Sequence, residues 1–210
     1  MLVVIVAFYG ALQFNHLGKT DYVEVRDYQG ARLSSINNFR ENSIKGPQNV
    51  NITTYKLQVY GDVSNPINYT YNEVLDNFTS YQKVVTLNCV EGWSATVLWE
   101  GVKVMDLVNQ ADPSGNAVII IFHAADGYTT SLPIDYIREN GLILAYKINE
   151  VTLPKANGYP FQLVAESKWG YKWCRWVTVL ELSSDASYEG YWESRGYSNT
   201  GDLGESFWGT

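Results

Sequence analysis

The chain of 210 residues is long enough to bury a hydrophobic core, and its 46% hydrophobic and 18% charged content is that of an ordinary folded protein. Its formal net charge of −7, with no basic cluster, argues against nucleic acid or an anionic membrane surface as a partner. Aromatic residues reach 14%, including 16 Tyr and 7 Trp, which favours half-buried strands and a pocket lined by rings.

The chain begins with an apolar run, Met1 to Phe14, that contains no charged residue. This run is shorter than the ~20 apolar residues that a membrane-spanning helix needs. We interpret residues 1–19 as an apolar anchor or the remnant of a signal segment, with a buried first strand as the alternative. We therefore expect an extracytoplasmic protein that is exported or membrane-anchored. Residues 20–210 are expected to form a single domain with both terminal segments wrapped on its surface.

Short strands are predicted where apolar and polar residues alternate, or where an apolar run lies between turn signals. These segments are residues 55–61, 83–88, 95–99, 117–122, 142–148 and 177–182. Three short helices are predicted at 71–78, 104–110 and 133–139, the first with Thr70 and Glu73 as a capping box. Asp126–Gly127 predicts the turn of a hairpin. Because strands outnumber the short helices, we predict an α+β fold that is mixed and β-rich.

Cys89 directly follows one predicted strand and opens a polar turn that contains Glu91 and Gly92. A strand end holds a sulfur atom rigidly while one side stays open, and a thiolate is a soft ligand suited to a transition metal. The second of the two cysteines, Cys174, lies far along the chain. The residues alone leave three interpretations open: a metal ligand, a small buried thiol, or a Cys89–Cys174 disulfide.

Four groups of short motifs follow one another along the chain. They are Cys89–Ser94 with Trp99 and Gly101, Asn157–Pro160, Lys168–Lys172, and Tyr191–Glu193 with Gly196–Tyr197. In this order they resemble the segment around the molybdenum-ligating cysteine, two late cofactor-binding loops and the closing segment of the sulfite oxidase family. The resemblance covers roughly residues 35–202 and is greatest to the catalytic subunits of periplasmic methionine-sulfoxide reductases.

The resemblance implies a chain folded around a Mo-molybdopterin cofactor, with Cys89 as the metal ligand. Cys89 and Glu91, a candidate proton donor just beyond it, are the expected catalytic residues. Three positions depart from the family pattern: Gln162 stands where arginine is usual, Ala124 stands where threonine is frequent, and Glu166 stands where proline is typical. The residues implied for cofactor binding are Asn37, Arg40, Glu41, Cys89, Asn157, Gln162, Lys172, Trp173, Cys174 and Arg175.

The expected reaction is two-electron oxygen-atom transfer, in the direction that reduces S- or N-oxides such as sulfoxides. The sequence has no Cys-x-x-Cys-His haem motif, so a separate redox partner is expected, which in the resembling reductases is a membrane haem protein. The alternative is a non-enzymatic binding module of the same fold that has lost the cofactor. Gln162 and Ala124 are the residues that support this alternative.

Overall fold

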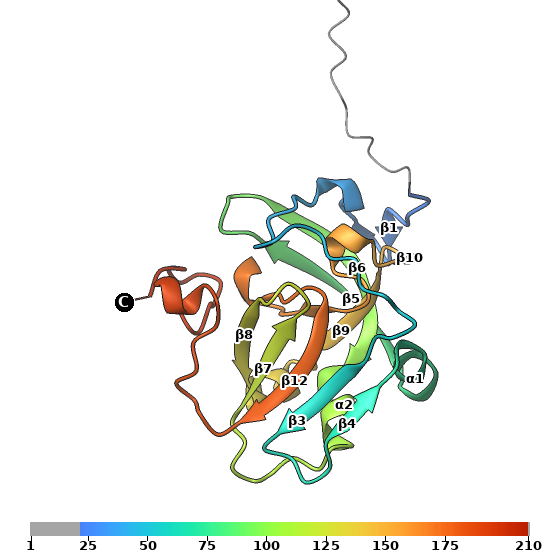
Figure 1. Cartoon of the computed structure of the whole chain (residues 1–210). Coiled ribbons are helices and arrows are strands. Elements are labelled where there is room, and N and C mark those ends of the chain that lie inside the picture. The colour runs from blue at the N-terminus through green and yellow to red at the C-terminus, as the bar shows by residue number, and fades with distance from the viewer. Residues whose placement is uncertain (1–21, 210) are drawn as a thin grey trace, which may run out of the picture.

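Two five-stranded sheets form the body of the protein (Figure 1). The computed structural model describes residues 22–209, so the predicted anchor at 1–19 lies outside the described residues. The first sheet has the order β10-β9-β6-β5, and β11 also pairs with β9. Its strands are β5 (Ser80–Asn88), β6 (Ser94–Lys103), β9 (Ile143–Ile148), β10 (Val151–Thr152) and β11 (Gln162–Val164).

The second sheet has the order β4-β3-β12-β7-β8. Its β12–β3 pair is parallel and its other pairs are antiparallel, which makes the sheet mixed. The hairpin predicted at Asp126–Gly127 is confirmed as the β7–β8 connection. The strands are β3 (Leu57–Gly61), β4 (Ile67–Tyr69), β7 (Ile119–Ala124), β8 (Thr129–Pro133) and β12 (Val177–Ser183), with a separate small pair β1 (Asp27–Tyr28) and β2 (Ala31–Arg32).

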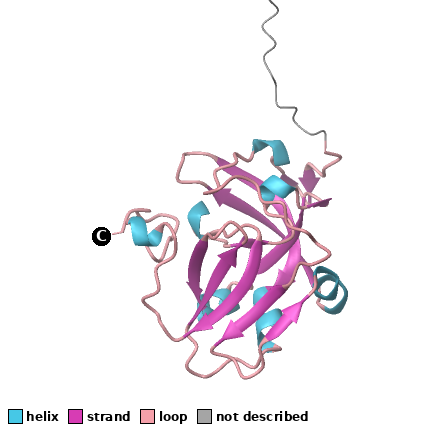
Figure 2. Ribbon diagram, viewed as in Figure 1, coloured by secondary structure: helices cyan, strands magenta, loops and turns pink. Residues whose placement is uncertain are grey.

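The helices are short and lie around the sheets (Figure 2). The capping box predicted at Thr70 and Glu73 is present, because each residue's side chain accepts a hydrogen bond from the backbone of the other. None of the helices in residues 22–209 is long and apolar enough to cross a membrane. The helices are α1 (Tyr71–Asn77), α2 (Val104–Asn109) and α3 (Ile134–Glu139), and the 3₁₀ turns are η1 (Ile36–Asn38), η2 (Lys155–Asn157), η3 (Gly170–Lys172) and η4 (Glu193–Arg195).

One hydrophobic cluster includes residues from both sheets. Leu57 and Val59 of β3 are fully buried and alternate with exposed residues, as expected for a strand that covers a core on one face. Strands β7 and β9 are buried along almost their whole length, which explains their continuous apolar sequences. The predicted mixed, β-rich α+β fold is therefore confirmed.

The N-terminal segment is attached to the body through Glu24 and Asn149. The Glu24 carboxylate accepts hydrogen bonds from Ser35 Oγ at 2.6 Å, Ile36 N at 2.9 Å and Asn149 Nδ2 at 2.8 Å. The fully buried Asn149 also accepts a hydrogen bond from the Leu98 backbone N of β6 at 3.0 Å. Burial raises the pKa of Glu24, but these hydrogen bonds outweigh it and hold the pKa below its ordinary value of 4.5.

The C-terminal segment, residues 184–209, is attached by a buried ion pair. Lys172 Nζ lies 2.7 Å from Glu193 Oε1, and neither side chain is exposed to solvent. The same carboxylate oxygen accepts from Thr130 Oγ1 at 2.6 Å, and Lys172 Nζ also donates to the Asn199 carbonyl at 2.9 Å. Charges buried in this way are tolerated only when each is paired and hydrogen-bonded.

The variant Glu24→Gln tests the N-terminal attachment. A carboxylate with a lowered folded-state pKa contributes stability above its unfolded pKa and loses it as the pH falls through the folded pKa. We expect Glu24→Gln to lower the free energy of unfolding by ~1.5–3 kcal/mol near neutral pH. The difference from the unsubstituted protein should shrink as the pH falls below 4.5, when measured by denaturant unfolding at several pH values. The exposed Glu139→Gln is the control, and a pH-independent difference for Glu24→Gln would contradict the prediction.

The variant Lys172→Met tests the C-terminal attachment. Removing the ammonium leaves the Glu193 carboxylate buried without a countercharge, so we expect a loss of ~3–5 kcal/mol of unfolding free energy. The double variant Lys172→Met/Glu193→Gln removes both charges and should recover part of that loss. Equal destabilisation in the single and double variants, measured by denaturant unfolding, would show that the charge pairing does not hold this segment.

Candidate active site

Cys89 lies in the tight loop of the β5–β6 hairpin. Its backbone N donates to the Trp93 carbonyl at 2.9 Å, and Gly92 N donates to the Cys89 carbonyl at 3.1 Å. The loop needs a glycine at position 92, where φ is +81°. Gly170 allows a second segment to lie close, because a Cβ there would meet the Asn88 carbonyl oxygen at 3.2 Å. The cysteine, with 5% of its surface exposed, is therefore held between two backbone segments.

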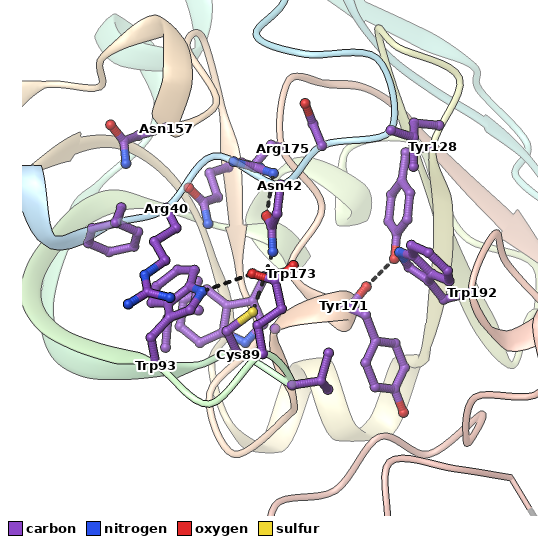
Figure 3. Close-up of a pocket in the computed structure, with 18 of the residues that line it drawn as sticks. Arg40, Asn42, Cys89, Trp93, Tyr128, Asn157, Tyr171, Trp173, Arg175 and Trp192 are labelled. Carbon is purple, nitrogen blue, oxygen red and sulfur yellow. Dashed lines mark hydrogen bonds between the residues drawn. The ribbon is translucent and has the colours of Figure 1, made fainter. Parts of the chain in front are cut away.

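A cavity of about 180 Å³ opens beside Cys89 (Figure 3). The N-terminal segment, the Cys89 loop, the β7–β8 turn, the segments around η2 and η3, and the C-terminal segment all contribute to its wall. Most of the site residues expected from the sequence therefore come together here. Those that line the cavity are Arg40, Cys89, Glu91, Asn157, Gln162, Trp173 and Arg175.

A second cavity, of about 140 Å³, adjoins the first. Phe39, Arg40 and Asn157 line both cavities. The second cavity is also lined by Asn37 and Glu41, the two remaining predicted residues of the early loop.

Arg175 is fixed in the cavity wall by several contacts. Its Nη1 donates to the Ala156 carbonyl at 3.2 Å, its Nη2 donates to Asn42 Oδ1 at 2.9 Å, and Nη2 lies 3.5 Å from Glu41 Oε1. Burial lowers the pKa of the guanidinium, although an arginine keeps its charge in proteins. Because a guanidinium has five N–H donors, Arg175 can still donate to an anionic group in the cavity.

Lys172 and Cys174 do not line either cavity. Residues 173–175 lie beside β11, where Leu163 N donates to the Cys174 carbonyl at 2.8 Å. Trp173 and Arg175 line the cavity, whereas Cys174 Sγ lies 3.9 Å from the Phe122 carbonyl. Lys172 is directed toward Glu193 instead. The side chains of Lys172 and Cys174 thus point away from both cavities. Their expected contacts with the cofactor remain predictions.

Both cysteines are free thiols in the structure, so the disulfide interpretation is not supported. Burial raises the pKa of the Cys89 thiol, and the Glu91 carboxylate adds to this effect. Hydrogen bonds from the Glu91 backbone and the Asn42 side chain act in the opposite direction. The thiol therefore keeps its proton at neutral pH until a metal or another cation displaces it.

Glu91 and Trp93 form the outer part of the Cys89 loop. Trp93 Nε1 lies 3.4 Å from Glu91 Oε2, and both residues line the cavity (Figure 3). Glu91 is exposed and lines the cavity that Cys89 also lines. Its expected role as a proton donor remains a prediction.

Several lining residues were not among the predicted site residues. Tyr128, Trp192 and Tyr197 form an aromatic part of the wall, and Asn42 and Ser43 supply polar groups. Trp192 and Tyr197 come from the C-terminal segment, which closes one side of the cavity as well as covering the surface. In the sequence, Trp192 and Tyr197 could have been found from the motif Tyr191–Glu193 with Gly196–Tyr197, which contains both residues. The segment around Asn42 offered only a high density of polar side chains.

Two buried polar atoms in the cavity wall lack a hydrogen-bond partner. They are Gln162 Oε1 and Ser43 Oγ, and Gln162 has only 2% of its surface exposed. An unpaired polar atom in such a place costs roughly 1–3 kcal/mol. Both residues also line the cavity.

The sequence matches the oxidoreductase molybdopterin binding domain family over residues 44–192. The uncharacterized oxidoreductase YuiH of Bacillus subtilis is 31% identical over 157 residues, which cover 74% of this chain and 78% of that protein. The putative protein-methionine-sulfoxide reductase subunit YedZ1 of Azospira oryzae is 32% identical over 149 residues, covering 70% of this chain and 56% of that protein.

Among solved structures, the sulfane dehydrogenase SoxCD of Paracoccus pantotrophus shares the fold with a TM-score of 0.65 and 20% identity. The match covers 74% of this chain and 43% of the SoxCD chain. The chain thus spans about half the length of YedZ1 and less than half of the SoxCD chain. The family match and the oxidoreductase relatives support an enzyme over a non-enzymatic binding module. They confirm the resemblance to the sulfite oxidase family: this chain belongs to the oxidoreductase molybdopterin-binding domain family and is an oxidoreductase of that class.

Proposed function

We propose that this chain binds Mo-molybdopterin with Cys89 as its metal ligand and reduces small S- or N-oxides. The observation that carries the proposal is the placement of the Cys89 thiol and the Arg175 guanidinium in the wall of one cavity. A thiolate is a ligand for a soft transition metal, and a guanidinium binds phosphate through paired hydrogen bonds. The two groups suit the metal end and the phosphate end of such a cofactor.

The residues of the cavity fit this group. Gln162 Oε1 and Ser43 Oγ are buried and unpaired, so they can bond to a polar ring system without losing bonds within the protein. Asn157 and Arg40 line the junction of the two cavities and add polar groups there. In this proposal Gln162 offers a neutral amide where an arginine is usual in the family, so Arg40 and Arg175 supply the positive charge of the cavity wall.

When bound, the cofactor supplies two-electron oxygen-atom transfer between the substrate and the metal. The chain would hold the metal through Cys89, and Glu91, which lines the same cavity, would provide a proton to the substrate oxygen. Trp93, Trp192 and Tyr197 give the cavity aromatic walls that exclude water from an organic substrate. A sulfoxide, with its polar S–O bond and apolar substituents, suits such a wall.

The electrons are proposed to come from a separate redox partner, as the lack of a haem-attachment motif in the sequence suggests. The name of the relative YedZ1, a reductase subunit, supports a multi-subunit arrangement. The apolar run at Met1–Phe14 supports an extracytoplasmic location. A membrane haem protein is the kind of partner that suits this location.

Reduction assays with an artificial electron donor test the substrate class. We expect oxidation of a reduced viologen dye to depend on added sulfoxide or N-oxide, with methionine sulfoxide as the first substrate to test. Glu91→Gln keeps the shape of the side chain but removes the carboxyl proton, and should lower kcat by roughly 10²-fold or more. Oxidation of sulfite without any reduction of S- or N-oxides would contradict the proposed direction.

Molybdenum content tests the metal ligand. Protein purified from a host that makes the cofactor should contain nearly stoichiometric molybdenum, and Cys89→Ser should lose most of it because a hydroxyl is a poor ligand for a soft metal. Cys174→Ser is the matched control, since this thiol lies outside both cavities. Metal-free protein from such a host, or equal metal in all three proteins, would be evidence against the proposal.

The variant Gln162→Met tests the polar cavity wall. Methionine has a similar shape but removes the unpaired Oε1, so cofactor-free protein should become more stable by up to about 1–3 kcal/mol in thermal or denaturant unfolding. The same change should lower the fraction of chains that retain cofactor. If the variant loses stability and keeps its cofactor, Gln162 serves the fold and not the ligand.

A further inference from the structure

A hydrogen-bonded chain connects Arg175, Asn42 and the Cys89 sulfur (Figure 3). Arg175 Nη2 donates to Asn42 Oδ1 at 2.9 Å, and Asn42 Nδ2 donates to Cys89 Sγ at 3.4 Å. Asn42 therefore joins the cationic group of the cavity to the proposed metal ligand. It was not among the predicted site residues, and the proposed function gives it no role.

The orientation of the Asn42 amide follows from its neighbour. A guanidinium has N–H donors and no acceptor, so only the carbonyl oxygen of the amide can face Arg175. The NH₂ group must then point the other way, toward Cys89 Sγ. Because Arg175 is itself fixed by Ala156 and Glu41, the amide cannot turn over without losing a charge-assisted hydrogen bond.

The backbone around Asn42 is also constrained. Ser43 N donates to Glu41 Oε1 at 2.9 Å, and the same carboxylate oxygen lies 3.5 Å from Arg175 Nη2. Glu41 and Asn42, adjacent in the chain, thus both contact one guanidinium. This double contact keeps the Asn42 side chain beside the sulfur even though the residue is exposed.

We propose that Asn42 is a positioning residue that donates an N–H···S hydrogen bond to the Cys89 thiolate in the loaded enzyme and raises the reduction potential of the metal. The proposal rests on the proposed function. A hydrogen bond to a ligating thiolate draws electron density away from the metal, and such bonds are a recognised means of tuning potential at metal–thiolate centres. A higher potential makes the metal easier to reduce, which suits an enzyme that receives electrons from a partner.

Two variants at position 42 test the proposal. The quantity measured is the reduction potential of the metal and not the catalytic activity. Asn42→Leu has a similar volume and no donor. Asn42→Asp still accepts from Arg175, but it places a carboxylate beside the sulfur in place of the donor. Asn49→Leu is the matched control, because Asn49 is an exposed asparagine of the same N-terminal segment outside both cavities.

The measurements are molybdenum per chain and the midpoint potential of the metal, from a redox titration followed by its optical or EPR signal. We expect both position-42 variants to retain molybdenum and to shift to lower potential, Asn42→Asp by more than Asn42→Leu, while Asn49→Leu matches the unsubstituted protein. Loaded variants with an unchanged potential would overturn the inference. Loss of molybdenum in both variants would also overturn it, because Asn42 would then serve to retain the cofactor. Absence of molybdenum from the unsubstituted protein would instead be the failure of the proposed function.

Discussion

The hydrogen bonds that close the β5–β6 hairpin are the constraint on which the site depends. The two strands pair along their whole length up to Asn88 and Ser94. The loop between them is closed by the hydrogen bonds from Cys89 N to the Trp93 carbonyl and from Gly92 N to the Cys89 carbonyl. The sulfur atom therefore has a fixed position before any ligand arrives. A thiol held in this way would need little reorganisation to bind a metal, which would lower the entropic cost of forming the bond.

Two cationic side chains near the site, Lys172 and Arg175, have different roles. Lys172 is fully buried and pairs with Glu193, which holds the C-terminal segment against the body. Arg175 has 17% of its side chain exposed and keeps donors free in the cavity. The C-terminal segment in turn brings Trp192 and Tyr197 to the cavity wall. The buried ion pair thus supports the site indirectly, because it holds in place the C-terminal segment that carries these two aromatic residues.

Local features of the sequence predicted much of the fold. The Thr70–Glu73 capping box, the Asp126–Gly127 turn and the alternation in β3 depend on neighbouring residues, so the sequence contains their signal. The position of Cys89 at a strand end was predictable for the same reason. The pairing of β12 with β3 and β7 was not, because it joins segments far apart in the chain.

The same distinction applies to the site. The motifs of the family led to Arg175, Asn157 and Gln162, which do line the cavity. They also led to Lys172 and Cys174, whose directions depend on contacts with Glu193 and Phe122, residues distant in sequence that a motif does not specify. Asn42 was missed because its hydrogen bonds join it to Cys89 and Arg175, which are distant from it in sequence.

The coordination of the metal is the most direct test of the central claim, that Cys89 binds the molybdenum of a pterin cofactor. X-ray absorption at the molybdenum edge counts the sulfur atoms bound to the metal. We expect one more sulfur ligand in the unsubstituted protein than in residual loaded Cys89→Ser protein, and the same number in Cys174→Ser as in the unsubstituted protein. An identical sulfur count in the unsubstituted protein and in Cys89→Ser would contradict it.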